Sequence, residues 1–280
     1  MTPVAAAQFT YDELTSIVGW YVDMGVDIAI DEAVHDRFSE DSQKLAAPAR
    51  APVRPPAETP KRAPLARIDA LPAPASPDQA IVSAKEISAR AQSLDELRAA
   101  IEAFDGCNLK RSAQRTVFAD GNPQARLMFV GEAPGADEDR QGIPFVGRAG
   151  QLLDRMLKAI NLDRSEVYIA NAVPWRPPGN RTPTPQETAI CLPFIRRQIE
   201  LVGPQVLVCL GASSMQSILG VNEGILKTRG RLFDYPMDNG RKIKAMATLH
   251  PAYLLRSPAQ KRLAWRDFQE IANLLKVASA

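Results

Sequence analysis

The chain has 280 residues, 45% hydrophobic and 24% charged, a composition typical of a soluble globular protein and not of a disordered or fibrous one. Because 34 Lys and Arg residues nearly balance 32 Asp and Glu residues, the net charge of +2 neither requires nor excludes nucleic acid, and any basic surface must be local. Three cysteines, no long apolar run and an acidic start exclude a disulfide framework, a membrane span and a signal peptide, so we expect a cytoplasmic protein.

The first 45 residues are predicted to form a separate, helical segment. Between residues 11 and 33, large apolar side chains recur at the spacing of one helix face. Such an amphipathic helix either packs weakly on its own domain or binds a partner protein, and the sequence favours neither. The apolar positions are Leu14, Ile17, Val18, Tyr21 and Met24.

Residues 46–80 are predicted to be a Pro/Ala-rich disordered linker. This stretch holds nine prolines and eleven alanines in 35 residues and almost no large apolar side chains. It therefore buries too little surface to offset the entropy lost on ordering, and we expect a semi-extended linker, partly in polyproline II conformation. The catalytic domain is predicted to span residues 81–280.

Within that domain, short apolar runs alternate with helical patterns, as in an α/β fold. The strands are nearly continuous apolar runs, which favours a mainly parallel sheet covered by helices on both faces, a three-layer α/β/α arrangement. In such sheets ligands bind beyond the carboxyl ends of the strands. The predicted strands are residues 126–130, 167–170, 206–210 and 244–249, and the predicted helices are residues 150–160, 184–202, 213–219 and 263–278.

The first predicted strand is followed by a loop rich in glycine and carboxylates, GEAPGADEDRQGIPFVG, which begins at Gly131. Carboxylates such as Glu132 and Glu138 would repel a phosphate, and the loop matches neither common nucleotide-binding motif. The same groups suit the stabilisation of developing positive charge and the orientation of water. Phe145 is a candidate stacking platform for a planar ring. Alternatively, Phe145 is loop packing and the carboxylates are a solvated face.

Two further polar residues follow predicted strands. Asn171 offers one acceptor and two donors, which suits recognition of the amide edge of a base. His250 ends another strand and precedes a proline. A lone histidine is more often structural, but strands ending in Glu132, Asn171 and His250 would bring all three side chains to one crevice.

A local basic excess indicates a polyanionic partner. Residues 229–266 contain nine basic side chains against Asp234 and Asp238. We expect Leu254 and Leu255 to be exposed on a loop beside Arg256, forming an apolar wedge flanked by phosphate contacts. Ordinary solvated charge on a helix would account for part of the pattern.

Three motifs, GEAPGADEDRQGIPFVGRAGQLLDRML, NAVPWRPPGNRTPTPQE and HPAYLLR, resemble the ordered motifs of the uracil-DNA glycosylase superfamily, in particular the type-4, iron-sulfur-containing enzymes. The resemblance covers roughly residues 107–275. It implies a parallel four-stranded sheet flanked by helices. It also implies a DNA-repair hydrolase that flips deoxyuridine out of double- or single-stranded DNA and releases uracil, leaving an abasic site.

The resemblance also implies roles for individual residues. Phe145 would stack on the flipped uracil, Asn171 would bind its amide edge, and His250 would donate to the oxygen beside the glycosidic bond. Glu132 and Glu138 are the carboxylates expected near the sugar and the water, without a settled division of labour. Gly131 would line the uracil pocket, Leu254 would enter the space left by the flipped base, and Arg256 would contact DNA. Many members of the superfamily carry an aspartate where this chain has Ala133.

The departures concern the iron-sulfur cluster, which type-4 enzymes bind through four cysteines. Cys107 and Cys191 occupy two of these positions, but Phe104 and Trp175 occupy the other two. A cubane cluster requires four ligands, so we predict no cofactor, with the two aromatic residues filling the space. A 4Fe-4S cluster held by a nonstandard ligand is the alternative. Cys209 is predicted to be a buried strand residue.

The leading hypothesis is a monomeric uracil-DNA glycosylase of base-excision repair. One alternative is a noncatalytic DNA-binding or polymerase-associated module, which the joint presence of Glu132, Asn171 and His250 disfavours. A second is a glycosylase with altered specificity for deaminated bases, including one that forms a covalent sugar adduct through His250.

Overall fold

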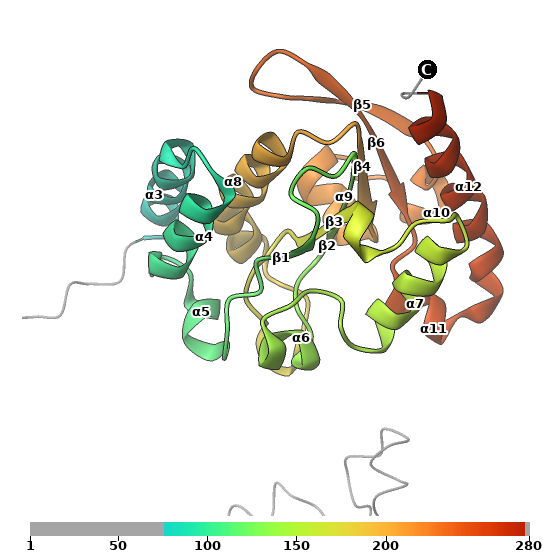
Figure 1. Cartoon of the computed structure of the whole chain (residues 1–280). Helices are drawn as coiled ribbons and strands as arrows, with labels where there is room; N and C mark the ends of the chain where they lie inside the picture. The colour runs from blue at the N-terminus through green and yellow to red at the C-terminus, as the bar shows by residue number, and fades with distance from the viewer. Residues whose placement is uncertain (1–75, 278–280) are drawn as a thin grey trace, which may run out of the picture. The chain divides into compact units, whose positions relative to one another are not determined.

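A computed structural model describes residues 76–277, all of which belong to the unit Asp69–Ala280. A twisted sheet runs through the middle of this unit, with helices on both sides (Figure 1). The strands lie in the order β1-β3-β2-β4-β6-β5. Their bounds are β1 Ala119–Gly121, β2 Leu127–Gly131, β3 Val167–Asn171, β4 Val206–Leu210, β5 Leu232–Pro236 and β6 Lys242–Thr248.

The four central strands confirm the predicted parallel sheet, because β3, β2, β4 and β6 all pair in parallel. The expected strand number is corrected from four to six, since β1 and β5 add an antiparallel edge on each side. Both edge strands are short or polar and lack a continuous apolar run. Such sequences are common at exposed edges, where they discourage pairing with other chains, and they give little strand signal.

The helices are α3 Pro77–Arg90, α4 Leu94–Ala103, α5 Asn108–Ser112, α6 Ala136–Gln141, α7 Arg148–Lys158, α8 Pro185–Val202, α9 Ala212–Leu219, α10 Ile225–Thr228, α11 Pro251–Arg256 and α12 Lys261–Val277. Short 3-10 turns form η1 Arg164–Glu166, η2 Pro178–Asn180 and η3 Pro258–Gln260. Among the residues described, no helix is both long and apolar enough to cross a membrane.

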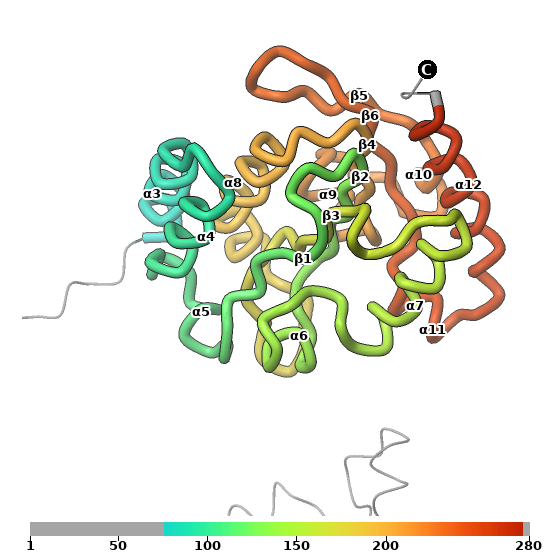
Figure 2. Tube along the Cα trace, in the orientation of Figure 1, coloured from blue at the N-terminus to red at the C-terminus, as the bar shows by residue number. Residues whose placement is uncertain are grey.

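Alternate residues of the central strands pack against opposite helix layers, which confirms the three-layer arrangement. In β2, Met128 and Val130 join a core cluster with residues of α8 and α9. Leu127 and Phe129 point the other way and pack with residues of α7 and α12, including Phe268, whose ring stacks on that of Phe129. In Figure 2 the central strands lie between α8 on one side and α12 on the other. Because helices cover both faces of the sheet, a ligand can approach the central strands only at their ends.

The boundary of the folded domain lies slightly earlier than predicted. Helix α3 begins at Pro77, with the Ser76 hydroxyl accepting a hydrogen bond from the amide of Gln79. Ala80 and Ala84 are buried, and α3 packs along α8. The predicted linker end at residue 80 is therefore too late, because alanines that look featureless in the sequence allow close helix packing. The predictions for residues 1–45, and for the linker up to residue 75, lie outside the described residues.

Helix α8 begins as the sequence predicts. The Thr184 hydroxyl accepts from the amide of Glu187, and the Glu187 carboxylate accepts from the amide of Thr184, forming a capping box with Pro185 in the first turn. This fixed start anchors the loop that runs from β3 to α8 and carries Trp175 and Thr182.

Candidate active site

Gly131 and Asn171 lie side by side at the carboxyl ends of β2 and β3, where they are paired in register. A Cβ atom added to Gly131 would overlap Asn171 Oδ1 and lie 2.6 Å from Phe145 Cζ. A glycine is therefore required for the amide and the ring to approach the end of β2. The structure thus brings Gly131, Asn171 and Phe145 together at the carboxyl ends of β2 and β3.

Phe145 and His250 complete the same site. Their ring centroids are 5.6 Å apart and their planes are inclined by 32°. Phe145 comes from the loop between α6 and α7, and its side chain is buried. His250 follows β6 and is the N-cap of α11. Residues separated by more than 100 positions thus lie against each other at one site beyond the carboxyl ends of the strands.

His250 is held as a neutral hydrogen-bond donor. Its Nδ1 accepts a hydrogen bond from the amide of Ala252 at 3.1 Å, so in the neutral ring the proton lies on Nε2. Burial, together with the positive charge of Arg256, lowers the pKa of His250 to about 4. At neutral pH the ring therefore presents an N–H group without carrying a charge.

The Asn171 side chain has an unused acceptor. The residue is buried, yet Oδ1 has no hydrogen-bond partner within residues 76–277. Leaving a buried polar atom unpaired costs about 1–3 kcal/mol, so such atoms are rare outside functional sites. Because it lies beside Gly131, close to the Phe145 ring, Oδ1 is placed to accept a hydrogen bond from a ligand with an N–H group.

Glu132 is the carboxylate that remains available for chemistry. It follows Gly131 directly and is partly buried. Burial raises its pKa, while a hydrogen bond from the Thr182 hydroxyl acts in the opposite direction. A carboxylate with a raised pKa close to the pocket suits the orientation of water or the stabilisation of a positively charged sugar.

The other carboxylates of the loop have structural partners. Glu138 Oε1 accepts from the amides of Val146 and Gly147 at 3.0 and 2.9 Å, and Oε2 accepts from the amide of Gly135. Both Glu138 oxygens are thus engaged in holding the loop that carries Phe145. A water-activating role for Glu138 stays a prediction that these bonds disfavour.

The remaining two loop carboxylates, Asp137 and Asp139, also have partners within the protein. Asp137 forms an ion pair with Arg140. Asp139 is buried and accepts from the amides of Gln114 and Arg115. The alternative of a purely solvated acidic face is therefore wrong for Asp139.

Leu254 requires a correction. We expected it on an exposed loop, but HPAYLLR forms helix α11, because His250 caps it and Pro251 occupies the first turn. Leu254 is fully buried and packs with Leu152 and Leu249 in a small core cluster. It is not exposed as a wedge. Leu255 is partly exposed and Arg256 is exposed at the end of the same helix.

The basic excess of residues 229–266 is also smaller than the sequence suggests. Arg229 forms a buried ion pair with Asp267, just beyond that range. Arg231 pairs with Glu223, and Lys244 pairs with Asp234. Asp267 and Glu223 lie outside residues 229–266, so the charge count over that range left them out, whereas Asp234 was already included.

The positions of the family's iron-sulfur cluster form an apolar cluster. Phe104, Trp175, Cys107 and Cys191 are all buried together with Phe194, whose ring meets that of Phe104 edge-on at 5.1 Å. Trp175 Nε1 donates to the Thr116 hydroxyl at 3.0 Å.

The donor set there does not fit a four-iron cluster. The neighbouring Cys107 thiol, together with burial, raises the pKa of the Cys191 thiol well above its usual value. Within the described part of the chain, no group of three His, Cys, Asp or Glu residues could hold a metal ion. Cys209 is a buried residue of β4, as predicted, and burial raises its pKa to about 12.

A buried aromatic ring, an unpaired amide oxygen and a neutral imidazole close to the ends of parallel strands are the groups that suit a planar, amide-containing ring. The model of the uracil DNA glycosylase superfamily matches residues 118–269. The chain belongs to that superfamily, which the sequence motifs had predicted.

Individual relatives agree with the family match. The chain is 40% identical over 187 residues to a type-4 uracil-DNA glycosylase of Archaeoglobus fulgidus, covering 65% of this chain and 94% of that protein. It is 41% identical over 173 residues to a type-4 uracil-DNA glycosylase of Thermotoga maritima, covering 61% and 88% of the two chains. It is also 38% identical over 187 residues to one of Sulfurisphaera tokodaii, covering 65% and 84%.

Proposed function

We infer that this member of the superfamily is a uracil-DNA glycosylase. It hydrolyses the N-glycosidic bond of deoxyuridine in DNA and leaves free uracil and an abasic site, the first step of base-excision repair. One observation carries this conclusion: the unpaired Oδ1 of Asn171 and the Phe145 ring both lie against Gly131, and the Phe145 ring lies against the neutral His250.

Each of the three side chains matches one feature of uracil. Asn171 Oδ1 accepts from N3–H of the base, which fills its missing bond. The Phe145 ring stacks on the flat face of the base. His250 Nε2–H donates to O2, where negative charge develops as the glycosidic bond breaks. A donor aimed at developing charge typically accelerates a reaction by about 100- to 1,000-fold.

Glu132 stabilises the charge on the sugar and orients the attacking water. As the base leaves, the sugar becomes positively charged, and a nearby carboxylate stabilises that charge. Water then attacks the sugar carbon, and its proton passes to a base of suitable pKa. Glu132 is partly buried and its pKa is raised, which suits this second task. Glu138 contributes by holding the loop of Phe145.

The target base enters the pocket by flipping out of the DNA stack. Asn171 and Phe145 are both buried, so a base paired inside a duplex cannot reach them. Flipping costs a few kcal/mol, least for a single strand or a mismatch. Because Leu254 is buried, the partly exposed Leu255 is the better candidate to enter the vacated space, with the exposed Arg256 beside it for a phosphate.

The enzyme works without an iron-sulfur cluster. The support is the aromatic packing of Phe104 and Trp175 at two cluster positions, which leaves only the thiols of Cys107 and Cys191 as possible ligands there. Protein purified without oxygen should be colourless and contain no stoichiometric iron or sulfide, and its activity should survive EDTA. A brown protein with close to four irons per chain would contradict this part of the proposal.

Location and assembly complete the proposal. The three cysteines are free thiols, which supports a reducing compartment such as the cytoplasm. We propose that the enzyme acts as a monomer. A protein partner for residues 1–45 stays a prediction.

The pocket is tested by single-turnover cleavage of an oligonucleotide that contains one uracil. Asn171→Ala and His250→Ala should each lower the rate by about 100-fold or more, while both proteins stay folded. Asn122→Ala, in the exposed turn before β2, is the matched control and should cleave at the wild-type rate. Tight DNA binding without cleavage by the wild type would favour the noncatalytic alternative instead.

A further inference from the structure

Phe145 has an unusual backbone conformation. Its φ is +55°, in the left-handed region that bulky side chains rarely adopt. The chain also turns tightly here, because a Cβ atom on Gly150 would overlap the Phe145 carbonyl. Such strain persists only where the surroundings hold the residue in place, and it is concentrated at functional sites.

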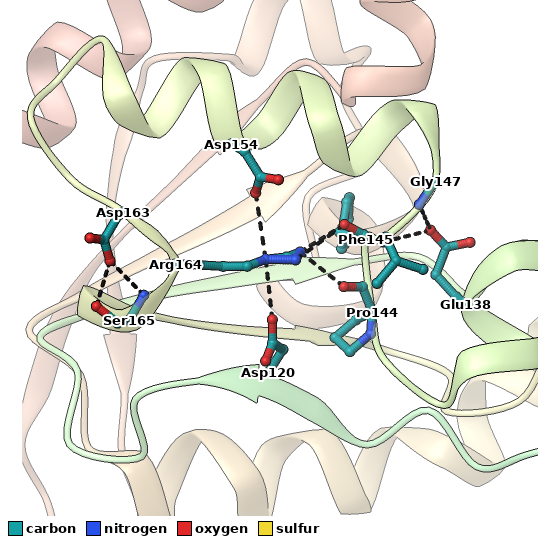
Figure 3. A network of polar contacts seen from close by, with 10 residues as sticks. Asp120, Glu138, Pro144, Phe145, Gly147, Asp154, Asp163, Arg164 and Ser165 are labelled. Atoms are coloured by element: carbon teal, nitrogen blue, oxygen red, sulfur yellow. Dashed lines mark hydrogen bonds and ion pairs between the residues drawn. The ribbon is translucent and has the colours of Figure 1, made fainter.

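Arg164 holds the carbonyl side of this turn. Its Nη2 donates to the carbonyls of Phe145 and Pro144 at 2.7 and 3.0 Å, and its Nη1 donates to Phe145 at 3.3 Å (Figure 3). Glu138 holds the amide side through the N–H groups of Val146 and Gly147. In Figure 3 the guanidinium and the carboxylate approach the same short segment from opposite sides.

The guanidinium is itself fixed by two carboxylates. Arg164 Nε lies 3.1 Å from Asp120 Oδ2 on β1 and 3.5 Å from Asp154 Oδ1 on α7 (Figure 3). These contacts are ion pairs and not hydrogen bonds, because the Nε–H group is not aligned with either oxygen. The Arg164 side chain is only 25% exposed. Arg164 thus links η1, β1 and α7 to the loop of Phe145.

We propose that Arg164 is a positioning residue for uracil recognition, which sets the plane of the Phe145 ring by gripping its carbonyl and does not touch the base itself. This proposal rests on the proposed function of the pocket. The planar guanidinium grips two neighbouring carbonyls at once, as the point charge of a lysine cannot do. Because the Phe145 ring forms one wall of the pocket with His250, a small rotation of the turn would misalign the stacked base with the donor.

The first test compares Arg164→Gln with Arg155→Gln, a matched loss of one positive charge at an exposed position of α7. Arg164→Gln should lower kcat/KM for a uracil oligonucleotide by about 10- to 100-fold, the scale expected for a misplacement of about 1 Å. It should also weaken inhibition by free uracil. Arg155→Gln should change neither value. If Arg164→Gln matched the wild type in both, the positioning role would be refuted.

The second test is a double-mutant cycle with Phe145→Ala. If Arg164 acts through the Phe145 ring, Arg164→Gln in the Phe145→Ala background should lower kcat/KM by less than about threefold. A further loss as large as in the wild-type background would show a purely structural or electrostatic role and overturn the proposal.

Arg164→Lys keeps the experiment informative if the glutamine variant unfolds. This variant retains the positive charge beside Asp120 and Asp154 but loses the planar guanidinium that donates to two carbonyls. It should therefore stay folded and still lose at least about threefold in kcat/KM. Full activity of Arg164→Lys would refute the proposal. A wild-type protein that binds no free uracil and cleaves no uracil DNA would instead refute the proposed function, so the two failures are distinguishable.

Discussion

The neutral state of His250 makes the stability of the protein depend on pH in a defined direction. The pKa of the folded imidazole is about 4, against 6.5 for an unperturbed one. Above pH 6.5 both the folded and the unfolded chain hold a neutral ring, so His250 adds no pH dependence. As the pH falls from 6.5 towards 4, the unfolded chain binds a proton that the folded chain does not, and stability is lost.

The size of this loss follows from the two pKa values. One pH unit corresponds to about 1.4 kcal/mol per proton, so the loss reaches about 2 kcal/mol at about pH 5 and about 3 kcal/mol below about pH 4. His250 is partly exposed to solvent, which makes both values upper limits. A loss of this size is a large fraction of the stability of an ordinary domain.

Urea denaturation of the wild type and of His250→Gln measures the effect. Glutamine does not titrate, so the difference between the two proteins cancels the contributions of other groups. Between pH 7 and about pH 5, the wild type should lose up to about 2 kcal/mol more than the variant. An equal loss in both proteins would show that the histidine is not held neutral. If His250 stays neutral in the folded enzyme, its titration should not lower the kcat/KM of the wild type near pH 6.5. A decrease centred there that is absent from His250→Gln would contradict this.

Three further predictions concern single residues. Gly131→Ala should lower kcat/KM at least about tenfold without unfolding, because the new Cβ would displace Asn171 or Phe145; Gly224→Ala, with open space around it, is the control for the glycine exchange. Glu138→Gln should lower kcat by about tenfold without moving its pH profile, whereas a general base would cost about 100- to 10,000-fold and alter the acid limb. Asp267→Asn should cost up to about 3–5 kcal/mol in urea, because it removes the charged partner of the partly buried Arg229, and a cost below about 1 kcal/mol would contradict a stabilising ion pair.

Local sequence patterns predicted the central sheet because its strands are short apolar runs. They could not predict β1 and β5, whose pairing partners are distant in sequence and whose residues are polar or interrupted by proline. Helix α3 was missed for a related reason. Its buried side chains include Ala80 and Ala84, and alanine indicates burial only when the neighbouring helix α8 is known.

The pocket itself was predictable because parallel strands bring their carboxyl ends together. Asn171 and His250 could be assigned to one site from that rule alone. The burial of Leu254 could not be predicted in this way, since it depends on contacts with α7 and with the residue that follows β6. The sequence pattern predicted a loop at Leu254, although Pro251 after a capping histidine is a signal for the start of a helix.

The residues that support the pocket were missed most completely. Arg164 is a charged residue in a polar turn and carries no local signal of its contact with Phe145, 19 positions away. For Glu138 a signal existed, since it stands three residues after Gly135, where a capping box places its acidic member. Roles defined by geometry between loops require the tertiary structure.

The most direct test of the central claim is mass spectrometry of the products formed from an oligonucleotide containing one uracil, in the presence of EDTA. We expect free uracil and an unbroken strand with an abasic site from the wild type, and at least about 100-fold less uracil from Asn171→Ala. Release of a nucleotide in place of the free base, a strand cut without alkali, or undiminished uracil release by Asn171→Ala would contradict the account.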